Sequence, residues 1–278
     1  MLKPNIIIIP IHKSIPDWSE LISFKQCFKI LFKHPICVIT YSGLDISYYT
    51  NLPAKAEAAF RIEYFDKKYF ENLAGYNRLL LSLEFYKRFK DFECILLYQL
   101  DAWVFRDELD YWCQKGYDYI GAPWFENYGS HDNGNKLWAV GNGGFSLRRV
   151  PSFLNILYYN KPLFKISELK IIYPQEKAFI RKIRRNLFIY LKSTGLKNNV
   201  SYFIKKYANN EDWFWALLFQ KSARPLKIPK CEEAIDFSFE KSPGYLYELN
   251  ERRLPFGCHA WEKYEYHTFW NNFIQEKE

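Results

Sequence analysis

A carboxylate at the end of a buried strand is the first feature of the sequence that could support chemistry. The apolar run Cys94–Tyr98 leads directly into Gln99, Leu100 and Asp101. Such a run is typical of a strand in a parallel sheet, and ligands bind outside the carboxyl ends of these strands. A carboxylate there can hold Mg²⁺ or Mn²⁺ on a diphosphate, because both ions prefer oxygen ligands. A strand-end Asp can equally cap the turn that follows it.

Three later segments carry further candidate groups, and each also has a purely structural explanation. Gly141–Gly144 has three glycines in four residues, which suits close approach of the backbone to a ligand or a tight hairpin turn. Glu211 and Asp212 precede an apolar helix, where a carboxylate caps the helix or acts as a general base. His259 is a core histidine, a stacking partner or a metal ligand.

The elements that must position these groups follow from hydrophobic spacing. Asn5–Pro10 and Ile36–Thr40 are predicted strands, with a helix of one apolar face at Ser19–Phe32 between them. Tyr76–Phe89 predicts another helix before the strand that leads to Asp101. Strand–helix–strand units of this kind predict an α/β fold with a mostly parallel central sheet flanked by helices.

The rest of the chain is predicted to alternate between helices, short strands and loops. Helices are expected at residues 109–115, 152–159, 177–192 and 211–221, strands at 117–121 and 145–147, a loop at 125–136, and an irregular aromatic segment at 254–270. No internal repeat interrupts this pattern, and the length suits one large domain or two small ones.

Charge is concentrated in one segment. Residues 161–206 contain twelve Lys or Arg but only Glu168 and Glu176, a balance of +10, so the rest of the chain carries about −2 of the net charge of +8. Within it, residues 177–192 predict a basic amphipathic helix. Three interpretations stay open: a solvated helix covering the core, a surface that docks on anionic lipid, or a nucleic-acid contact. We favour the lipid surface and expect no nucleic acid, since no base-recognition motif accompanies the charge.

The cysteines and the apolar runs bear on the compartment. The six cysteines form no CxxC pair, which argues against a zinc ribbon and for free thiols in a reducing compartment. No signal peptide is recognisable, and no uncharged run approaches the ~20 residues that cross a bilayer. We therefore expect a cytoplasmic protein, either free or at the inner face of the cell membrane.

Taken in order, the motifs resemble a family of microbial glycosyltransferase-like proteins that is similar to a branch of the GT-A superfamily. The resemblance spans roughly Ile6–Trp261. Its most specific parts are Gly-Ala-Pro-Trp at 121–124 and Gly-Asn-Gly-Gly-Phe-Ser-Leu-Arg at 141–148. It implies a single GT-A-like, Rossmann-like domain over 1–278. Residues 1–125 would mainly bind the nucleotide-sugar, and residues 126–278, with the basic segment 161–206, would mainly bind the acceptor.

The resemblance also implies roles for individual residues. Asp101 takes the place of the last Asp of the Asp-x-Asp motif and Gln99 that of the first, which leaves one carboxylate where the family pattern has two. Asp101 and His259 would bind a divalent cation, Mn²⁺ or Mg²⁺, and Asp212 would be the catalytic base. The remaining implied contacts are Pro10, His12, Thr40, Gln99, Asp101, Gly143 and Gly144 to the donor, and Trp124, Asn142, Glu211 and Trp213 to the acceptor.

The function implied is transfer of a sugar from a UDP- or GDP-linked donor to a glycan or lipid-linked acceptor in surface polysaccharide or glycolipid synthesis. Inversion with Asp212 as base is the leading form. Retention on the same fold stays open, as does an inactive carbohydrate-binding protein. A nucleotidyltransferase is disfavoured, because residues 10–14 contain no glycine for a phosphate loop.

Overall fold

The computed structural model describes residues 2–52, 60–134, 136–158, 162–172 and 178–274. The strands in these ranges are β1 Lys3–Pro10, β2 Ile36–Tyr41, β3 Arg61–Phe65, β4 Phe92–Tyr98, β5 Ala102–Val104, β6 Tyr119–Ile120, β7 Pro123–Phe125, β8 Leu137–Val140, β9 Phe145–Arg149, β10 Ser238–Phe239 and β11 Gly257–His259. Three sheets result, and the largest holds six of these strands.

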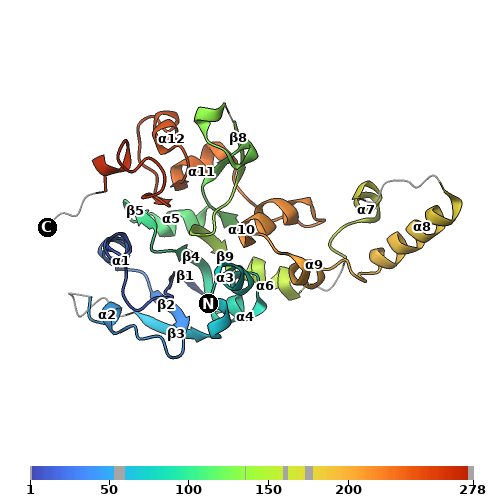
Figure 1. Cartoon of the computed structure of the whole chain (residues 1–278), viewed down its shortest axis with the longest axis horizontal. Helices are drawn as coiled ribbons and strands as arrows, with labels where there is room; N and C mark the ends of the chain where they lie inside the picture. Colours follow the sequence, from blue (N-terminus) through green and yellow to red (C-terminus); the bar gives the residue numbers. More distant parts are fainter. Residues whose placement is uncertain (1, 53–59, 135, 159–161, 173–177, 275–278) are drawn as a thin grey trace.

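Helices cover both faces of this main sheet, and α7 and α8 project from one side of it (Figure 1). The α-helices are α1 Trp18–Leu31, α2 Ser47–Thr50, α3 Leu73–Leu80, α4 Leu83–Arg88, α5 Leu109–Gln114, α6 Val150–Tyr158, α7 Ile166–Ile172, α8 Phe179–Ser193, α9 Val200–Lys206, α10 Glu211–Trp213, α11 Cys231–Phe237 and α12 Pro243–Leu249. A π-helical turn, Phe214–Leu218, and a 3₁₀ turn, Phe219–Lys221, prolong α10. Other 3₁₀ turns lie at Lys67–Tyr69, Glu126–Tyr128, His131–Asn133 and Trp270–Asn272.

The main sheet has the order β3-β2-β1-β4-β9-β6. Strands β3, β2, β1 and β4 run parallel, whereas β9 is antiparallel to both β4 and β6. The α/β class and the mostly parallel, helix-flanked sheet predicted from sequence are therefore confirmed. Strand order reverses between β1 and β4, and a crevice for ligands opens at such a reversal beyond the carboxyl ends of the strands.

The central strands are buried on both faces, which explains their unbroken apolar sequences. Ile6–Ile9 of β1 and Ile95–Tyr98 of β4 are all buried. One face packs against α3, α4 and α6, and the other against α1 and α5. The strand β9 comes from the second half of the chain but pairs with β4 along Cys94–Tyr98. The predicted donor half and acceptor half thus share one sheet.

Two predicted helices differ from the structure. The segment 76–89 forms two helices, because Ser82 ends the first and its side chain accepts a hydrogen bond from Phe85 N at the start of the second. The helix predicted at 177–192 is α8, Phe179–Ser193, and Lys177 lies outside the described residues.

Candidate functional site

A cavity of about 430 Å³ lies at the reversal point of the main sheet. Its walls include Pro10 to Lys13, which follow β1, and Gln99 to Asp101, which follow β4. Of the predicted donor contacts, Pro10, His12, Gln99 and Asp101 therefore line one cavity. Its volume lies within the range of about 300–1,000 Å³ that small-molecule sites occupy.

The opposite wall of this cavity comes from residues that the sequence did not point to. They are Tyr49 of α2 and the segment from Tyr69 to Tyr76, which leads into α3. The hydroxyls of Tyr49 and Tyr76 are buried; that of Tyr49 has no hydrogen-bond partner among the described residues, and that of Tyr76 faces the Gln99 side chain. Burying a hydroxyl without a partner costs free energy, so the Tyr49 hydroxyl is the better candidate for a hydrogen bond to a polar ligand in the cavity. Thr40, a predicted donor contact, is buried in β2 and does not line it.

At the edge of the cavity, Asp101 meets His259 from the antiparallel strand β11. His259 Nε2 lies 3.2 Å from Asp101 Oδ1, and the Asp101 side chain is 46% exposed. Burial raises the pKa of Asp101, but the attraction of the His259 imidazole outweighs it and holds that pKa below its usual value. For His259 the balance is reversed: burial lowers the pKa, and Asp101 and Glu240 raise it well above the usual value.

Glu240 is a member of this cluster that the sequence analysis missed. Its carboxylate lies 3.1 Å from His259 Nδ1, on the side of the ring away from Asp101. A carboxylate at one ring nitrogen fixes the orientation of the imidazole, and here it directs the other nitrogen at Asp101. No motif marks Glu240 in the sequence, because only the pairing of β10 with β11 brings it to the histidine.

The glycine-rich turn joins these residues to the base candidate. Asn142 is buried, and its Oδ1 accepts hydrogen bonds from Gly144 N and Phe145 N. A Cβ on Gly144 would lie 2.0 Å from His259 Nε2, whereas one on Gly143 would lie 3.7 Å from Asp212 Oδ2. The turn therefore packs closely against both side chains, and Gly144 leaves no room for a larger residue.

Asp212 has a carboxylate suited to taking up a proton near neutral pH. Burial raises its pKa to about 7, with further increases from Glu211 and Glu240. Its Oδ1 accepts a hydrogen bond from Trp213 N. A general base works best when its pKa lies near the working pH. Glu240 raises the pKa of both Asp212 and His259, so it couples the base candidate to the Asp101–His259 pair.

Glu211 has a different environment from its neighbour Asp212. It is 1% exposed, and its two oxygens accept hydrogen bonds of 2.7 and 3.1 Å from the buried guanidinium of Arg148. Trp124 is also buried, against Gly141, and Asn142 shapes the turn. Trp213 stacks on Tyr128 with ring centroids 3.9 Å apart. Of the predicted acceptor contacts, Trp124, Asn142 and Glu211 thus lie inside the protein, where they can support the site.

The close fit of Gly144 against His259 gives a direct prediction. Gly144→Ala should displace the imidazole and lower stability by about 1–3 kcal/mol, as overpacked sites do. Thermal unfolding measures this effect. Gly143→Ala is the stability control, because its added Cβ would meet Glu211 Oε1 at 3.4 Å. Equal stability of both variants would contradict this packing.

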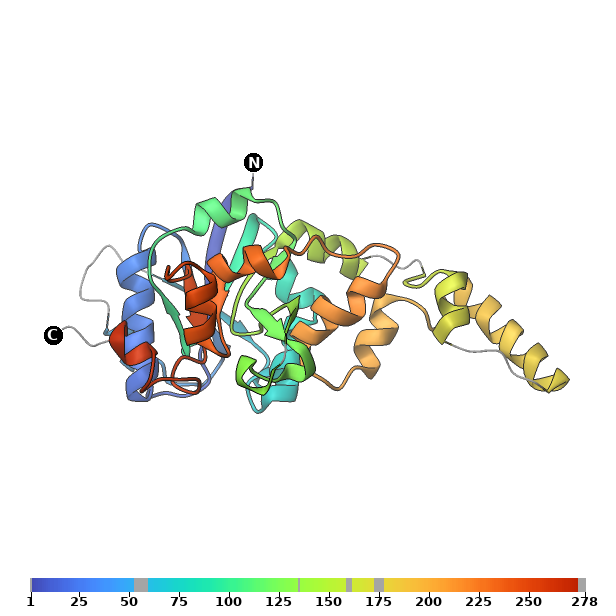
Figure 2. The same cartoon turned by 90° about the horizontal axis from the view of Figure 1, so that it is seen from above.

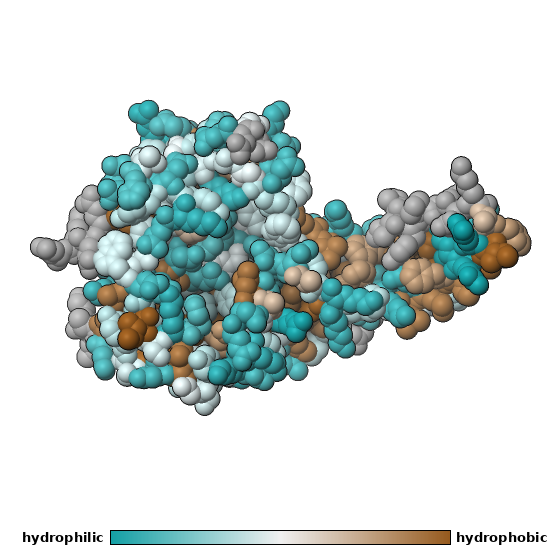
Figure 3. Space-filling model, viewed as in Figure 1, coloured by the Kyte–Doolittle hydropathy of each residue, from teal (hydrophilic) through white to brown (hydrophobic). Residues whose placement is uncertain are grey.

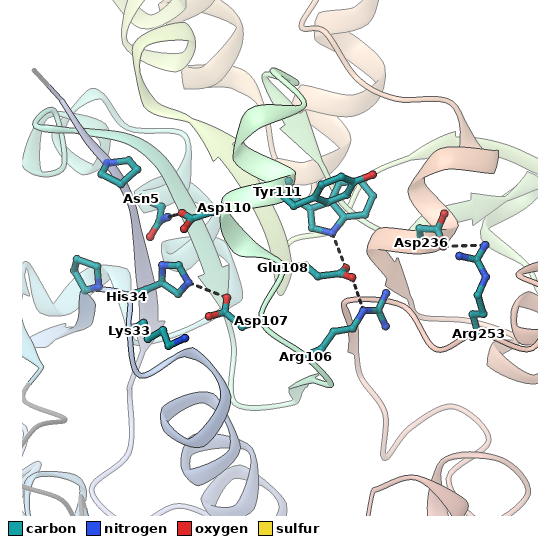
Figure 4. Close-up of a pocket in the computed structure, with 13 residues that line it drawn as sticks. Asn5, Lys33, His34, Arg106, Asp107, Glu108, Asp110, Tyr111, Asp236 and Arg253 are labelled. Atoms are coloured by element: carbon teal, nitrogen blue, oxygen red, sulfur yellow. Dashed lines mark hydrogen bonds and ion pairs between the residues drawn. The ribbon is translucent and has the colours of Figure 1, made fainter.

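A second cavity, of about 680 Å³, lies at the opposite end of the sheet beside the start of β1 (Figure 4). Most of its charged groups pair with one another. His34 contacts Asp107, Arg106 contacts Glu108, and Arg253 contacts Asp236, while Asn5 Nδ2 donates to Asp110. It contains none of the residues predicted from the sequence motifs. The cavity at the carboxyl ends of β1 and β4 is therefore the candidate site.

A cation site was predicted at Asp101 and His259. Within the ranges that the structure describes, no group of three or more His, Cys, Asp or Glu side chains could hold a metal ion. The two predicted ligands nonetheless fit a shared cation. His259 Nε2 and Asp101 Oδ1 lie 3.2 Å apart, close to the ~3 Å that separates two ligand atoms at right angles on Mg²⁺, so a cation would take the place of the ion pair between them.

The fold and site describe a mixed α/β protein with a ligand cavity at the strand-order reversal. The family model described as "Protein of unknown function (DUF5672)" matches residues 59–259, so the chain belongs to this family. No curated protein matches the chain. Among solved structures, it is similar to the one titled "Crystal Structure of A197 from STIV", with 14% identity and a TM-score of 0.30 over 57% of this chain and 71% of that one. A likeness this slight carries no argument.

Proposed function

We propose that this protein is a GT-A-type glycosyltransferase that transfers a sugar from a nucleoside diphosphate donor to a hydroxyl of a glycan or lipid-linked acceptor. The observation that carries the proposal is the cavity at the β1/β4 reversal, with Asp101 and His259 at its edge. Ligands of open α/β sheets bind at this position. The strand order β3-β2-β1-β4 followed by an antiparallel strand supports a nucleotide-binding half at the N-terminal end.

The donor would lie with its base in the cavity and its diphosphate toward Asp101. Tyr69 and Phe70 offer aromatic faces, and the unpartnered hydroxyl of Tyr49 offers a hydrogen bond to base or ribose. Asp101 and His259 would hold Mn²⁺ or Mg²⁺, which neutralises the charge that develops on the departing diphosphate. Glu240 would keep His259 Nε2 directed at that ion.

Asp212 would act on the acceptor. Its carboxylate accepts the proton of the attacking hydroxyl while the hydroxyl oxygen bonds to the anomeric carbon and the bond from that carbon to the phosphate oxygen breaks. The nucleoside diphosphate leaves with the electron pair, and the configuration at the anomeric carbon inverts. The raised pKa of about 7 supports this role, because a carboxylate with an ordinary pKa is a weaker base. This basicity favours an enzyme over an inactive binding protein.

Binding of sugar nucleotides tests the proposal directly. We expect at least one UDP- or GDP-sugar with Mn²⁺ to raise the melting temperature. A ligand at 100 times its Kd adds about 2.7 kcal/mol. Asp101→Ala should weaken this binding about 100-fold in calorimetry, whereas Asp107→Ala, in the opposite cavity, should not. Undiminished binding to Asp101→Ala would remove the donor-site assignment.

A further inference from the structure

An arm projects from the side of the domain (Figure 2). It comprises the described residues 162–172 and 178–199, with the helices α7 and α8. Asn198 lies where the arm joins the domain. Its side-chain amide donates to the backbone carbonyl oxygens of Phe164 and Lys192, and its backbone carbonyl oxygen accepts from Leu163 N. The two ends of the arm therefore meet at one buried residue, and α8 extends away from the core.

The apolar face of α8 is directed outward. Seven of its apolar residues are 40–76% exposed: Phe188, and a stripe formed by Phe179, Ile180, Ile183, Leu187, Tyr190 and Leu191. At 3.6 residues per turn the six residues of the stripe fall within about 120° of the helix circumference, and Phe188 lies outside it. Ile189, on another side, is buried. A helix that covered the core would bury the larger stripe, so this interpretation of the basic segment is wrong. Figure 3 shows the resulting brown surface along the arm.

Positive charge borders this apolar stripe. Arg181, Lys182 and Arg184 are exposed on the remaining circumference of α8, which has no acidic residue. The described arm carries eight Lys or Arg and one Glu. An exposed apolar face flanked by cations is the composition that enters the interface of an anionic bilayer. Among the described residues, no helix is long and apolar enough to cross a membrane.

We propose that α8 lies in the surface of an anionic lipid bilayer and holds the domain against it. The apolar stripe would enter the acyl boundary, and the flanking cations would contact lipid phosphates. A helix of 15 residues is about 22 Å long, which is sufficient for an interfacial anchor. This inference extends the proposed function, since it places the acceptor at a membrane, but lipid binding is measured without any sugar nucleotide.

Vesicle flotation of the full chain tests the arm. The protein should float with phosphatidylcholine vesicles containing about 30% phosphatidylglycerol and not with phosphatidylcholine alone. Ile183→Glu/Leu187→Glu should reduce the bound fraction at least about ten-fold. The matched control, Ile15→Glu/Leu249→Glu, adds the same charge at exposed apolar sites elsewhere and should float like the unaltered protein.

Two further measurements decide between the anchor and its alternatives. Arg181→Gln/Lys182→Gln/Arg184→Gln, or high salt, should remove the preference for anionic vesicles. Equal flotation with both lipids, or an unaffected Ile183→Glu/Leu187→Glu variant, would overturn the proposal. If the protein sediments as a dimer, the Ile183→Glu/Leu187→Glu variant sediments as a monomer, and neither binds vesicles, the stripe is instead an interface with a second copy of the chain. Donor binding in the same variants tests the site separately.

Discussion

Asp212→Asn should lower the rate of sugar transfer about 10²- to 10⁴-fold while leaving donor affinity within about two-fold, because a general base contributes only after the donor has bound. An amide keeps the shape of the side chain but cannot accept the proton. The rate measured with saturating sugar nucleotide and acceptor, together with donor titration, separates these effects. An active Asp212→Asn enzyme would reject Asp212 as the base.

The pH dependence of stability gives an independent test of the same residue. The folded protein protonates Asp212 with a pKa of about 7 and the unfolded chain with one near 4, so the folded state binds more protons between these values. Unfolding free energy therefore falls as the pH rises through this window. At pH 8 Asp212→Asn should be more stable than the unaltered protein by up to about 4 kcal/mol. At pH 4 the difference in unfolding free energy between the two should be much smaller. Asp236→Asn, at the far end of the sheet, is the control.

Glu211→Ala should destabilise the protein by about 3–5 kcal/mol, since it leaves the guanidinium of Arg148 buried without a counter-charge. Chemical denaturation measures this change. For a chain of this size, it corresponds to a fall in melting temperature of roughly 10 °C.

A double variant distinguishes a lost ion pair from lost packing. Arg148→Met/Glu211→Leu removes both charges together and should recover much of the lost stability, because apolar residues of similar volume replace buried ion pairs well. If Glu211→Ala had the same melting temperature as the unaltered protein, Glu211 would not be the buried partner of Arg148. The two adjacent acids thus have opposite predicted effects on stability, although the sequence presents them as one motif.

Local sequence was sufficient for the central strands of the main sheet but not for its edge strand β3, which was not predicted. The runs that became β1, β2 and β4 are apolar and short, and they are buried on both faces as predicted. The position of Asp101 followed, because a side chain directly after β4 must lie at the strand-order reversal. The break at Ser82 was missed since the apolar spacing continues through both helices, and only the capping hydrogen bond ends the first.

The rest of the candidate site depends on contacts between distant segments. Glu240 reaches His259 through the pairing of β10 with β11, and Tyr49 joins the cavity wall from α2. Neither residue belongs to a local pattern. Spacing in 177–192 indicated an apolar face on a helix, but it did not indicate whether that face packs inside the protein or outside. The tertiary structure decides this, and it leaves the face exposed.

Both ends of the arm meet at Asn198, and this allows the arm to evolve independently of the rest of the fold. Leu163 and Phe164 are hydrogen-bonded to Asn198, although 34 positions separate Phe164 from Asn198. A segment whose ends already touch can lengthen, shorten or exchange its sequence without moving the sheet or the cavity, since the cost of closing a loop grows slowly with its length. The arm is therefore the part of the molecule in which a new surface preference can arise while the remainder of the fold is retained.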